Sequence, residues 1–464
     1  MKPRRWLLSL FVLAAFSVAS CDTLEVLDQE PSGDIPADQA FATAQNAESV
    51  LVGAYDEVQD GAFIDDGTIF AALAADQAIH SGSFPSWQAI DAHNLAPTNP
   101  EAGDQWSESY DIINVANTLI AGVPDVVGEG EDQLSQARAD ELIGQARVMR
   151  AYAYHNLIKW FGVRGGVGVP LVLERTGAIE DVTFPERASY SAVYDQIISD
   201  LQQAEDQAPP PGNGVGFIDT DVASALLARV LLYDRQFGAA AEKAGEFIDA
   251  SGDVPQGEGY ALNDAYSTTY EALNTNESIW ELQYNEQDDN AMAFFAYRNG
   301  FGGRYEYAPG ALIGAYDSTD VRLASNFTTQ GVESVVVIDK YFRATNGDDH
   351  HYILRLPEMM LIRAEGLAKS GGDSDEALAL VNRIRTRAGA DSVSADEFSG
   401  NEESIILRER RLELAFEGHR WHDLVRTENA VDVLPQLSSE NSTRWPIPQD
   451  DLDTNENLSQ NPGY

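Results

Sequence analysis

The amino-acid sequence predicts a mainly α-helical protein in which paired helices are joined by long irregular segments and a few short strands. Apolar residues recur every three or four positions in segments spread along the chain, which is the spacing of an amphipathic helix. In two places a helix with small residues leads through a short turn into a second, alanine-rich helix. The two turns contain Phe237-Gly238 and Gly371-Gly372. Helix pairs of this kind bury their apolar faces against the next pair.

The expected elements follow one another along the chain. One long helix is expected to end at Gly162, because glycine favours the conformation that stops a helix. "SIWELQYN", which begins at Ser278, alternates enough to predict a strand. Residues 61–105 and 284–350 are rich in Gly, Asn, Asp and aromatic residues, so we expect them to be irregular and to carry function. The expected helices occupy residues 37–60, 106–123, 139–162, 190–206, 221–250 and 356–389.

The segments 221–250 and 356–389 have the layout of tetratricopeptide-type helix pairs, although the match within any one repeat is weak. Pairs of this type stack into a right-handed superhelical scaffold. Proteins built from them usually bind other molecules and seldom catalyse reactions. Binding is therefore the expected class of function.

The composition is that of an unusually acidic globular protein. The 464 residues are 44% hydrophobic, which suits one large domain or two closely associated ones. The 75 acidic residues outnumber 30 basic ones, for a net charge of -45. Such a surface repels phosphates, so we expect no nucleic-acid partner. Adaptation to high salt is one interpretation, since molar salt shortens the Debye length to ~3 Å and screens self-repulsion. The other interpretation is a merely acidic protein.

The first twenty residues predict a signal peptide. Basic residues at positions 2, 4 and 5 precede an apolar stretch from Trp6 to Phe16, which is too short to span a bilayer. The following "VASC" is typical of a bacterial lipoprotein box, in which cleavage makes Cys21 the lipidated N-terminus. The alternative is an ordinary signal peptide with a chance cysteine, but Cys21 is the only cysteine of the chain. We expect a signal peptide at 1–20, a lipidated tether at 21–36, a folded part at 37–464, and no membrane attachment other than the lipid.

The stretch "EGHRWHDL" near the C-terminus contains two histidines with the spacing of one helix face, His419 and His422. A zinc site would need further ligands, and the sequence contains no HExxH motif. Arg and Glu alternate through "LRERRLELAFEGHRWHDLVR" at 407–426, which predicts a buried or half-buried ion network. We therefore expect this stretch to be structural, to pair Arg420 with Glu417, and to bind no metal.

The same stretch also resembles a known family. "RRLELAFEGHRWHDLVR" and the end of the chain, "WPIPQDDLDTNENLSQNPGY", look like the C-terminal signature of the SusD/RagB outer-membrane nutrient-binding lipoproteins. "RLPEMMLIRAEGLAKSGGDSDEALALVNRIRTRAG" resembles the helix pair before that signature. "QARVMRAYAYHNLIKWFGVRGGVGVPLVLE" and "FPERASYSAVYDQIISDLQQAE" resemble the middle of the family, and "LDQEPSGDIPADQAFATAQNAESVLVGAYDEVQ" resembles its start. The resemblance therefore spans nearly the whole chain after Cys21. One departure is His422, where the family usually has an aromatic residue.

The resemblance implies a fold, a location and a partner. It implies four tetratricopeptide-like helix pairs, with an N-terminal SusD-like part at about 37–235 and a C-terminal RagB/SusD part at about 270–464. It implies a lipid anchor on the outer face of the outer membrane and a SusC-like TonB-dependent transporter as partner. It implies binding of an oligosaccharide, or in some members a peptide, without enzymatic activity or a cofactor, and it makes His422 a packing residue. The residues that match the signature are Arg411, Glu413, Glu417, Gly418, Arg420, Trp421 and Asp423.

Two other classes of function remain as alternatives. A surface glycosidase would use paired carboxylates, for which Asp65-Asp66, Asp288-Asp289 and Asp348-Asp349 are candidates. With 75 acidic residues, pairs are expected by chance, and the sequence has no G-x-S-x-G, P-loop or zinc motif. A purely structural surface protein is the third class, although aromatic residues in irregular segments count against it.

The candidate ligand-binding residues come from the two irregular segments. Sugar rings stack on aromatic side chains, and polar side chains hydrogen-bond to the edges of the sugar. We expect a loop to carry Trp87, so that its ring contributes to binding and little to the helical core, although each candidate ring could instead be packed in the core. The candidate rings are Phe84, Trp87, Tyr305 and Tyr307, and the candidate polar residues are Asp76, Asn94 and Arg304.

Overall fold

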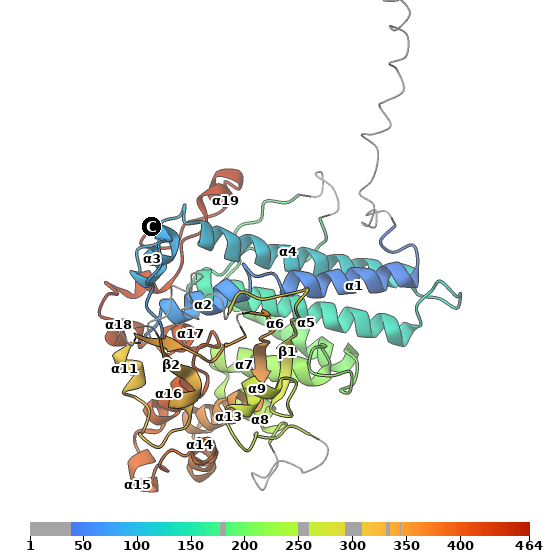
Figure 1. The fold of residues 1–464 in the computed structure, drawn as a ribbon. Coiled ribbons are helices and arrows are strands. Elements are labelled where there is room, and N and C mark those ends of the chain that lie inside the picture. The colour runs from blue at the N-terminus through green and yellow to red at the C-terminus, as the bar shows by residue number, and fades with distance from the viewer. Residues whose placement is uncertain (1–38, 177–181, 249–258, 293–308, 331–334, 344) are drawn as a thin grey trace, which may run out of the picture.

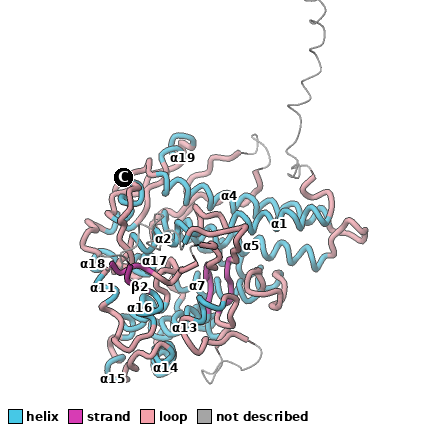
Figure 2. The backbone as a smooth tube through the Cα atoms, viewed as in Figure 1, coloured by secondary structure: helices cyan, strands magenta, loops and turns pink. Residues whose placement is uncertain are grey.

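The structure is a computed structural model that describes residues 39–176, 182–248, 259–292, 309–330, 335–343 and 345–464. Helices dominate the backbone, and short strands lie among them (Figure 2). The predicted mainly α-helical fold is therefore confirmed. The expected signal peptide, the tether and Cys21 lie outside the described residues.

A continuous stack of helices forms the body of the described chain (Figure 1). Its members are α1 (Ala44–Val58), α4 (Pro100–Gly122), α5 (Gln136–Phe161), α6 (Tyr190–Gln207), α7 (Thr220–Tyr233), α8 (Phe237–Gly245), α13 (Leu356–Ser370) and α14 (Ser374–Arg387). Each helix packs against the next in this order. The stack can be divided into the successive pairs α1/α4, α5/α6, α7/α8 and α13/α14, which is the arrangement expected of tetratricopeptide-like repeats.

Small residues allow neighbouring helices of the stack to approach closely. A Cβ added to Gly366 of α13 would lie 2.6 Å from the Phe237 carbonyl oxygen and 2.8 Å from the Ala241 Cβ of α8. A larger side chain there would push the two helices apart. Gly371 ends α13 in the left-handed region, with a φ of 73°, so the predicted Gly371-Gly372 turn is confirmed.

Short antiparallel pairs of strands accompany the helices in the described part of the chain. β1 (Ser278–Leu282) lies within the predicted strand and pairs with β4 (His351–Arg355), which places Ser278 opposite Arg355. β2 (Phe327–Gln330) pairs with β3 (Val335–Ile338). Because α13 begins directly after β4, the β1–β4 pair is attached to the helical stack.

Residues 61–105 are less irregular than the sequence predicts. They contain α2 (Asp65–Leu73), α3 (Pro85–Asp91) and the start of α4 at Pro100. α2 is buried on almost all sides. Its apolar residues therefore do not show the period of a helix with one solvent-exposed face. The remaining short helices are η2 (Val123–Val126), α9 (Thr268–Ala272), α11 (Gly310–Ile313), α12 (Arg322–Asn326), α15 (Ala395–Phe398), α16 (Glu402–Glu413), α17 (Arg420–Arg426), α18 (Ala430–Val433), η4 (Glu440–Thr443) and α19 (Gln449–Thr454).

One predicted boundary is wrong, and the C-terminal signature does not form a single helix. The turn between α7 and α8 precedes Phe237, and Arg235 occupies the left-handed region there with a φ of 66°. The segment 407–426 breaks between α16 and α17, where Phe416 and Gly418 have positive φ values of 65° and 79°. His419 therefore precedes α17 as its N-cap and does not belong to a longer helix. Among the described residues, no helix combines the length and apolarity needed to cross a membrane.

Candidate functional site

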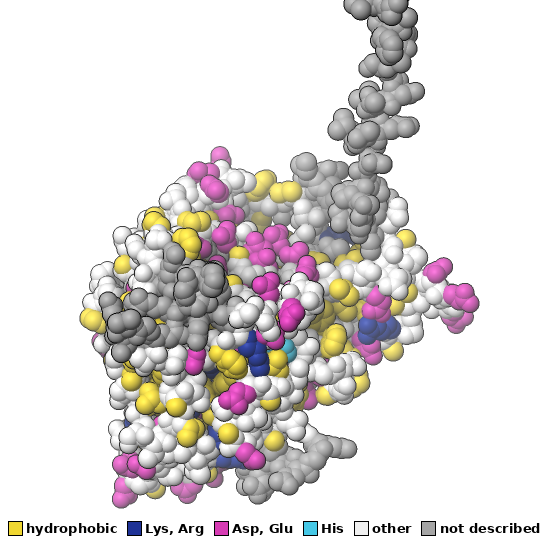
Figure 3. Space-filling view, in the orientation of Figure 1, with side chains coloured by type: hydrophobic (Ala, Val, Ile, Leu, Met, Phe, Trp, Pro, Cys, Tyr) yellow, Lys and Arg dark blue, Asp and Glu magenta, His cyan; other side chains and the backbone are white. Residues whose placement is uncertain are grey.

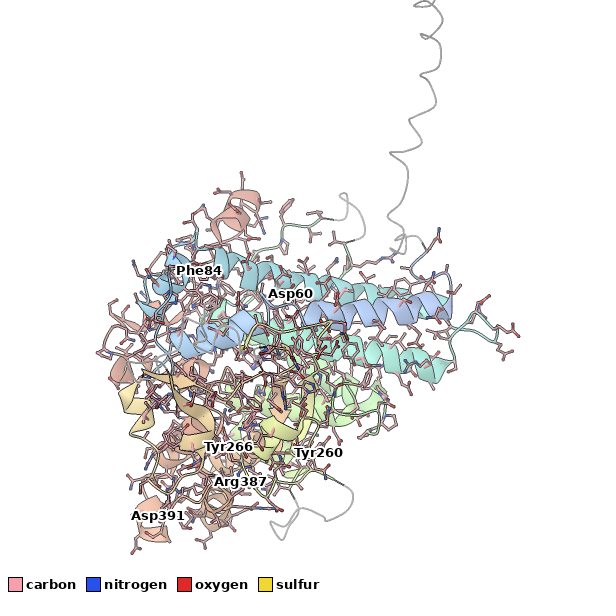
Figure 4. The ribbon with its side chains drawn as sticks, viewed as in Figure 1. Asp60, Phe84, Tyr260, Tyr266, Arg387 and Asp391 are labelled. Carbon is pink, nitrogen blue, oxygen red and sulfur yellow. The ribbon has the colours of Figure 1, made fainter. Side chains whose placement is uncertain are left out.

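The segment between α2 and α4 carries one of the predicted ligand-binding rings at the surface. Phe84 precedes Pro85, the first residue of α3, and its side chain is 47% exposed. It lies at the outer edge of the molecule (Figure 4). The Trp87 ring lies behind it, with the two ring centroids 6.1 Å apart. Phe84 therefore remains about half exposed at the N-terminus of a short helix, and we name this surface the Phe84 edge.

Trp87 does not lie on a loop, contrary to expectation. It belongs to α3 and is only 5% exposed. Its ring makes an edge-to-face contact with Phe70 of α2, with the centroids 5.0 Å apart. α3 begins at a proline, which favours the first position of a helix, and the helix directs Trp87 and Ile90 toward the core. Trp87 therefore supports the Phe84 edge from inside the fold.

Asp76 is a structural residue and not an open edge for a ligand. Its carboxylate accepts hydrogen bonds from Arg420 Nε at 2.8 Å and Nη2 at 3.1 Å, and Arg411 Nη2 lies 2.9 Å away. Burial alone would raise the pKa of Asp76, but Arg420 and Arg411 hold it below its usual value. The contacts tie the connection after α2 to the C-terminal signature. They also correct the expectation that Arg420 is paired with Glu417.

The other predicted polar residues and rings remain separate from this group. Asn94 is exposed after the end of α3, and its backbone N–H donates to the Ala89 carbonyl. Arg304, Tyr305 and Tyr307 lie outside the described residues. The structure thus brings Phe84 and Trp87 together, and it places Asp76 in an ion cluster with the signature arginines.

Glu417 is the centre of the signature's buried ion network. Its carboxylate accepts from Arg355 Nε at 2.7 Å, from Arg355 Nη2 at 2.8 Å and from Lys340 Nζ at 2.5 Å. Glu413 accepts from Arg355 Nη1 at 2.8 Å and from Arg322 Nη1 at 3.0 Å. Burial would raise the pKa of both glutamates, but the surrounding cations hold each pKa below its usual range. These partners lie far upstream in sequence, and no local pattern marks them.

The second half of the signature also contains buried ion pairs. Asp423 accepts from Arg410 Nε at 3.0 Å and from Arg426 Nε at 2.8 Å. Trp421 is 1% exposed and stacks on the His93 ring at a centroid distance of 5.2 Å. The signature therefore links α16, α17 and the segment after α3 into one buried unit.

His422 occupies an aromatic packing position. Its ring makes an edge-to-face contact with Trp160 at 4.5 Å between centroids, and only 3% of the residue is exposed. Burial lowers the pKa of His422 well below its usual value, so the ring is neutral. Nδ1 of His419 lies 3.8 Å from a Glu358 oxygen. In the described part of the chain, no group of three or more His, Cys, Asp or Glu residues is placed to hold a metal ion.

The two carboxylates of the pair Asp65-Asp66 have different surroundings. Both oxygens of Asp65 are engaged within the fold: one lies 2.5 Å from His351 Nε2 and the other accepts from the Ala291 N–H. Asp66 is half-buried among other acidic residues, and burial raises its pKa to about 8. Asp65 is therefore held by internal contacts, whereas neighbouring carboxylates raise the pKa of Asp66 further.

Comparison with known families gives two matches on separate parts of the chain. Residues 312–442 match a family model described as "SusD family". Residues 25–232 match one described as "Starch-binding associating with outer membrane". Together they cover most of the sequence, so the chain belongs to the SusD/RagB family.

Individual relatives agree with this assignment. "SusD-like protein P38" from Formosa agariphila is 27% identical, with 96% of each chain covered. "Starch-binding protein SusD" from Bacteroides thetaiotaomicron is 29% identical over 38% of this chain and 31% of its own. Among solved structures, one described as "Laminarin binding SusD-like protein" has a TM-score of 0.77 at 24% identity and covers 91% of this chain and 100% of its own. That structure shows that the two chains share a fold.

Proposed function

We propose that the protein captures an extracellular oligosaccharide at the cell surface and delivers it to a SusC-like TonB-dependent transporter, without catalysing a reaction. The observation that carries this proposal is the near full-length similarity to SusD-like proteins. Relatives named for starch binding and laminarin binding support a glycan as the ligand. The family description that mentions the outer membrane supports the location.

The Phe84 edge supports the ligand class. An exposed ring at the start of a short helix offers a flat apolar surface for the C–H face of a sugar. Handover to a transporter requires that the ligand leave on the timescale of transport. We therefore expect dissociation constants between micromolar and millimolar, which correspond to about -8 to -4 kcal/mol.

A glycan array read with purified protein tests the ligand class, and peptides on the same array test the alternative within the family. Phe84→Ala should weaken binding of the best glycan at least tenfold. Val52→Ala removes an apolar side chain from α1 that is even more exposed, at 70%, and should leave binding unchanged. Turnover of a glycan at an enzymatic rate would refute the non-catalytic part of the proposal.

The partner and the anchor are tested in cells. A pull-down from detergent-solubilised outer membrane should recover a large barrel protein with this chain. Cys21→Ala should release the protein from the membrane fraction, since the lipid on Cys21 is the proposed anchor. Retention of that variant as firmly as the parent, or a pull-down without a barrel, would contradict the respective part of the proposal.

A further inference from the structure

The structure contains a cavity of about 460 Å³ whose lining residues are distant in sequence from Phe84. It is lined by residues from the end of α5, the start of α6, the end of α7, α17 and η4. Its size falls within the range of ~300–1,000 Å³ that is typical of small-molecule sites. None of the predicted ligand-binding residues that the structure describes lines it.

Cations are concentrated in this cavity, which we name the basic cavity. Four of its thirteen lining residues are basic, whereas the whole chain has 30 basic residues among 464. Two lining residues, Glu428 and Glu440, are acidic. In a chain with a net charge of -45, a cavity with more cations than anions needs a reason. The basic residues are Lys159, Arg164, Arg426 and Arg444.

Two of the charged lining residues are neutralised within the fold. Arg426 lies 2.5 Å from a Glu365 oxygen and 2.8 Å from an Asp423 oxygen. Glu428 forms an exposed ion pair with Arg235, and its charge also interacts with Arg164 and Arg444. The other acidic lining residue is Glu440, whose side chain is 53% exposed and whose nearest carboxylate oxygen is 3.9 Å from Arg444.

The three remaining cations keep unused hydrogen-bond donors. Lys159 is half-buried and forms no hydrogen bond or ion pair with any residue that the structure describes. Arg164 donates to the Tyr233 carbonyl at 2.5 Å and lies over the Tyr190 ring at 5.2 Å, without a carboxylate partner among the described residues. Nη1 of Arg444 donates to the Glu440 carbonyl at 2.6 Å, whereas its Nε is buried and has no hydrogen-bond partner among the described residues. A buried donor without an acceptor is costly, and an anion in the cavity would supply the acceptor.

We propose that the basic cavity binds the anionic group, a carboxylate or a sulfate ester, of an acidic sugar. Arg164 and Arg444 would hydrogen-bond to the anion, Lys159 would contribute its ammonium group, and the half-buried Tyr190 ring would contact the sugar body. The choice of a sugar as carrier rests on the proposed function, whereas the preference for an anion rests on the cavity alone.

Lys159 gives the site a dependence on pH. Burial lowers the pKa of Lys159 to about 7, and Arg229 acts in the same direction. A bound anion would favour the charged amine, so binding at pH 8 should take up protons and the affinity should fall as the pH rises from 6 to 9. His155 and His422 have pKa values well below the usual value, so they stay neutral throughout this range. Apart from the charged residues of the basic cavity, the groups that face Lys159 are Arg229, Glu358, Asp423, His155 and His422.

Calorimetric titration of the full mature protein with three probes tests the proposal. The probes are glucuronate, glucose 6-sulfate and uncharged glucose, and inorganic sulfate is titrated separately. At least one charged sugar should bind tenfold or more tightly than glucose. Titration at pH 8 in buffers of different ionisation enthalpy should show net proton uptake. Equal binding of the three sugars would overturn the proposal, as would equal binding of inorganic sulfate and the sulfated sugar, which would indicate an anion site without sugar selectivity.

Two variants locate the binding. Arg164→Gln and Lys159→Gln should each lower the affinity for the charged sugar at least tenfold, while glycan binding at the Phe84 edge stays at the parental level. Lys369→Gln removes a cation that does not line the cavity and serves as the matched control. Unchanged affinity in the folded cavity variants would refute the site. If either variant fails to fold, the proposal is tested by the parent protein alone: binding of the charged sugar at pH 8 without net proton uptake would refute the role of Lys159. If the parent protein binds a charged sugar but no neutral glycan, the Phe84 edge is refuted and the basic cavity stands.

Discussion

Arg355 and Glu417 form a two-point ion pair in the interior of the protein. Nε and Nη2 of Arg355 lie 2.7 Å and 2.8 Å from the two carboxylate oxygens of Glu417, and each side chain is 1% exposed. Arg355 ends β4, and Glu417 lies between α16 and α17. The pair therefore joins the sheet that leads into α13 to the C-terminal signature.

Glu417→Ala should lower the free energy of unfolding by about 3–5 kcal/mol, because it leaves Arg355 and Lys340 short of a buried partner charge. Chemical denaturation at neutral pH measures the loss. The pKa of Glu417 is held below its ordinary value of 4.5. Its contribution to stability is therefore fully present above that value and is lost as the pH falls through the lower pKa of the folded state. The difference between parent and variant should therefore shrink only in acid. If the free energies of unfolding of parent and variant differ by less than about 1 kcal/mol at pH 7, the ion pair contributes little to stability.

Arg420→Ala should cost less than Glu417→Ala. Its partner is Asp76, and the two side chains are 10% and 19% exposed, so water can partly replace the lost contact. Asp76 also keeps Arg411 as a second cation. We expect a loss of about 1–2 kcal/mol, the range of a partly buried charged hydrogen bond. In a double-mutant cycle, Arg420→Ala and Asp76→Ala should show coupling, whereas Arg420→Ala and Glu417→Ala should be nearly additive.

His422→Phe should be folded and within about 1 kcal/mol of the parent at pH 7, because an aromatic ring of similar shape replaces a neutral one beside Trp160. The pKa of His422 is lowered by burial, so the unfolded chain binds its proton more tightly, and the parent loses stability as the pH falls below about 6.5. The variant should lose less between pH 7 and pH 5. Stoichiometric zinc in the purified parent that disappears in the variant would contradict the packing role.

Some helices of the stack could be predicted because only one face of the helix is buried. α6 illustrates this, with buried Val193, Ile197, Leu201 and Ala204 at regular helical intervals. α3 could not be predicted in the same way. It has seven residues and only Trp87 and Ile90 are buried, which is too few to establish a period. The expectation of an irregular segment there also led to the expectation of an exposed Trp87.

The partners of charged residues could not be predicted from local sequence. The density of Arg and Glu at 407–426 indicates an ion network, and the ion pairs of Glu413, Glu417 and Asp423 form one. The sequence does not reveal that Arg420 bonds Asp76, which is 344 positions away. The basic cavity could not be predicted for the same reason, because Lys159, Arg164 and Arg444 come together only in the folded chain.

Asp66→Asn should stabilise the protein above pH 8. Acidic side chains gather over α4 and the start of α2 (Figure 3), and Asp60 lies at the end of α1 beside α4 (Figure 4). Burial raises the pKa of Asp66 to about 8, with Glu101, Asp65, Asp104 and Asp60 acting in the same direction. A carboxylate with a raised pKa favours folding at low pH, and that contribution is lost as the pH rises through 8.

Thermal melts in low and molar salt measure this effect. The Tm of Asp66→Asn should exceed that of the parent at pH 8.5 and low salt, and the difference should shrink at pH 5 or in molar salt. Asp132→Asn removes the same charge from an exposed loop and serves as the control. The parent itself should gain Tm from low to molar salt because screening relieves its self-repulsion. A parental Tm that is flat across this range would remove the interpretation of high-salt adaptation.

Trp87→Ala should destabilise the fold, in contrast to Phe84→Ala. Trp87 is 5% exposed and packs edge-to-face on Phe70, so truncating its ring leaves a cavity between α2 and α3 that costs about 3–5 kcal/mol. Phe84 is 47% exposed, and its truncation should change the free energy of unfolding by less than about 1 kcal/mol. Denaturation of both variants, followed by glycan titration of each folded protein, distinguishes a residue that stabilises the fold from one that contacts the ligand. Phe84→Ala should lose affinity at unchanged stability. If Trp87→Ala instead lost affinity with full stability, Trp87 itself would contact the ligand and the supporting role assigned to it would be wrong.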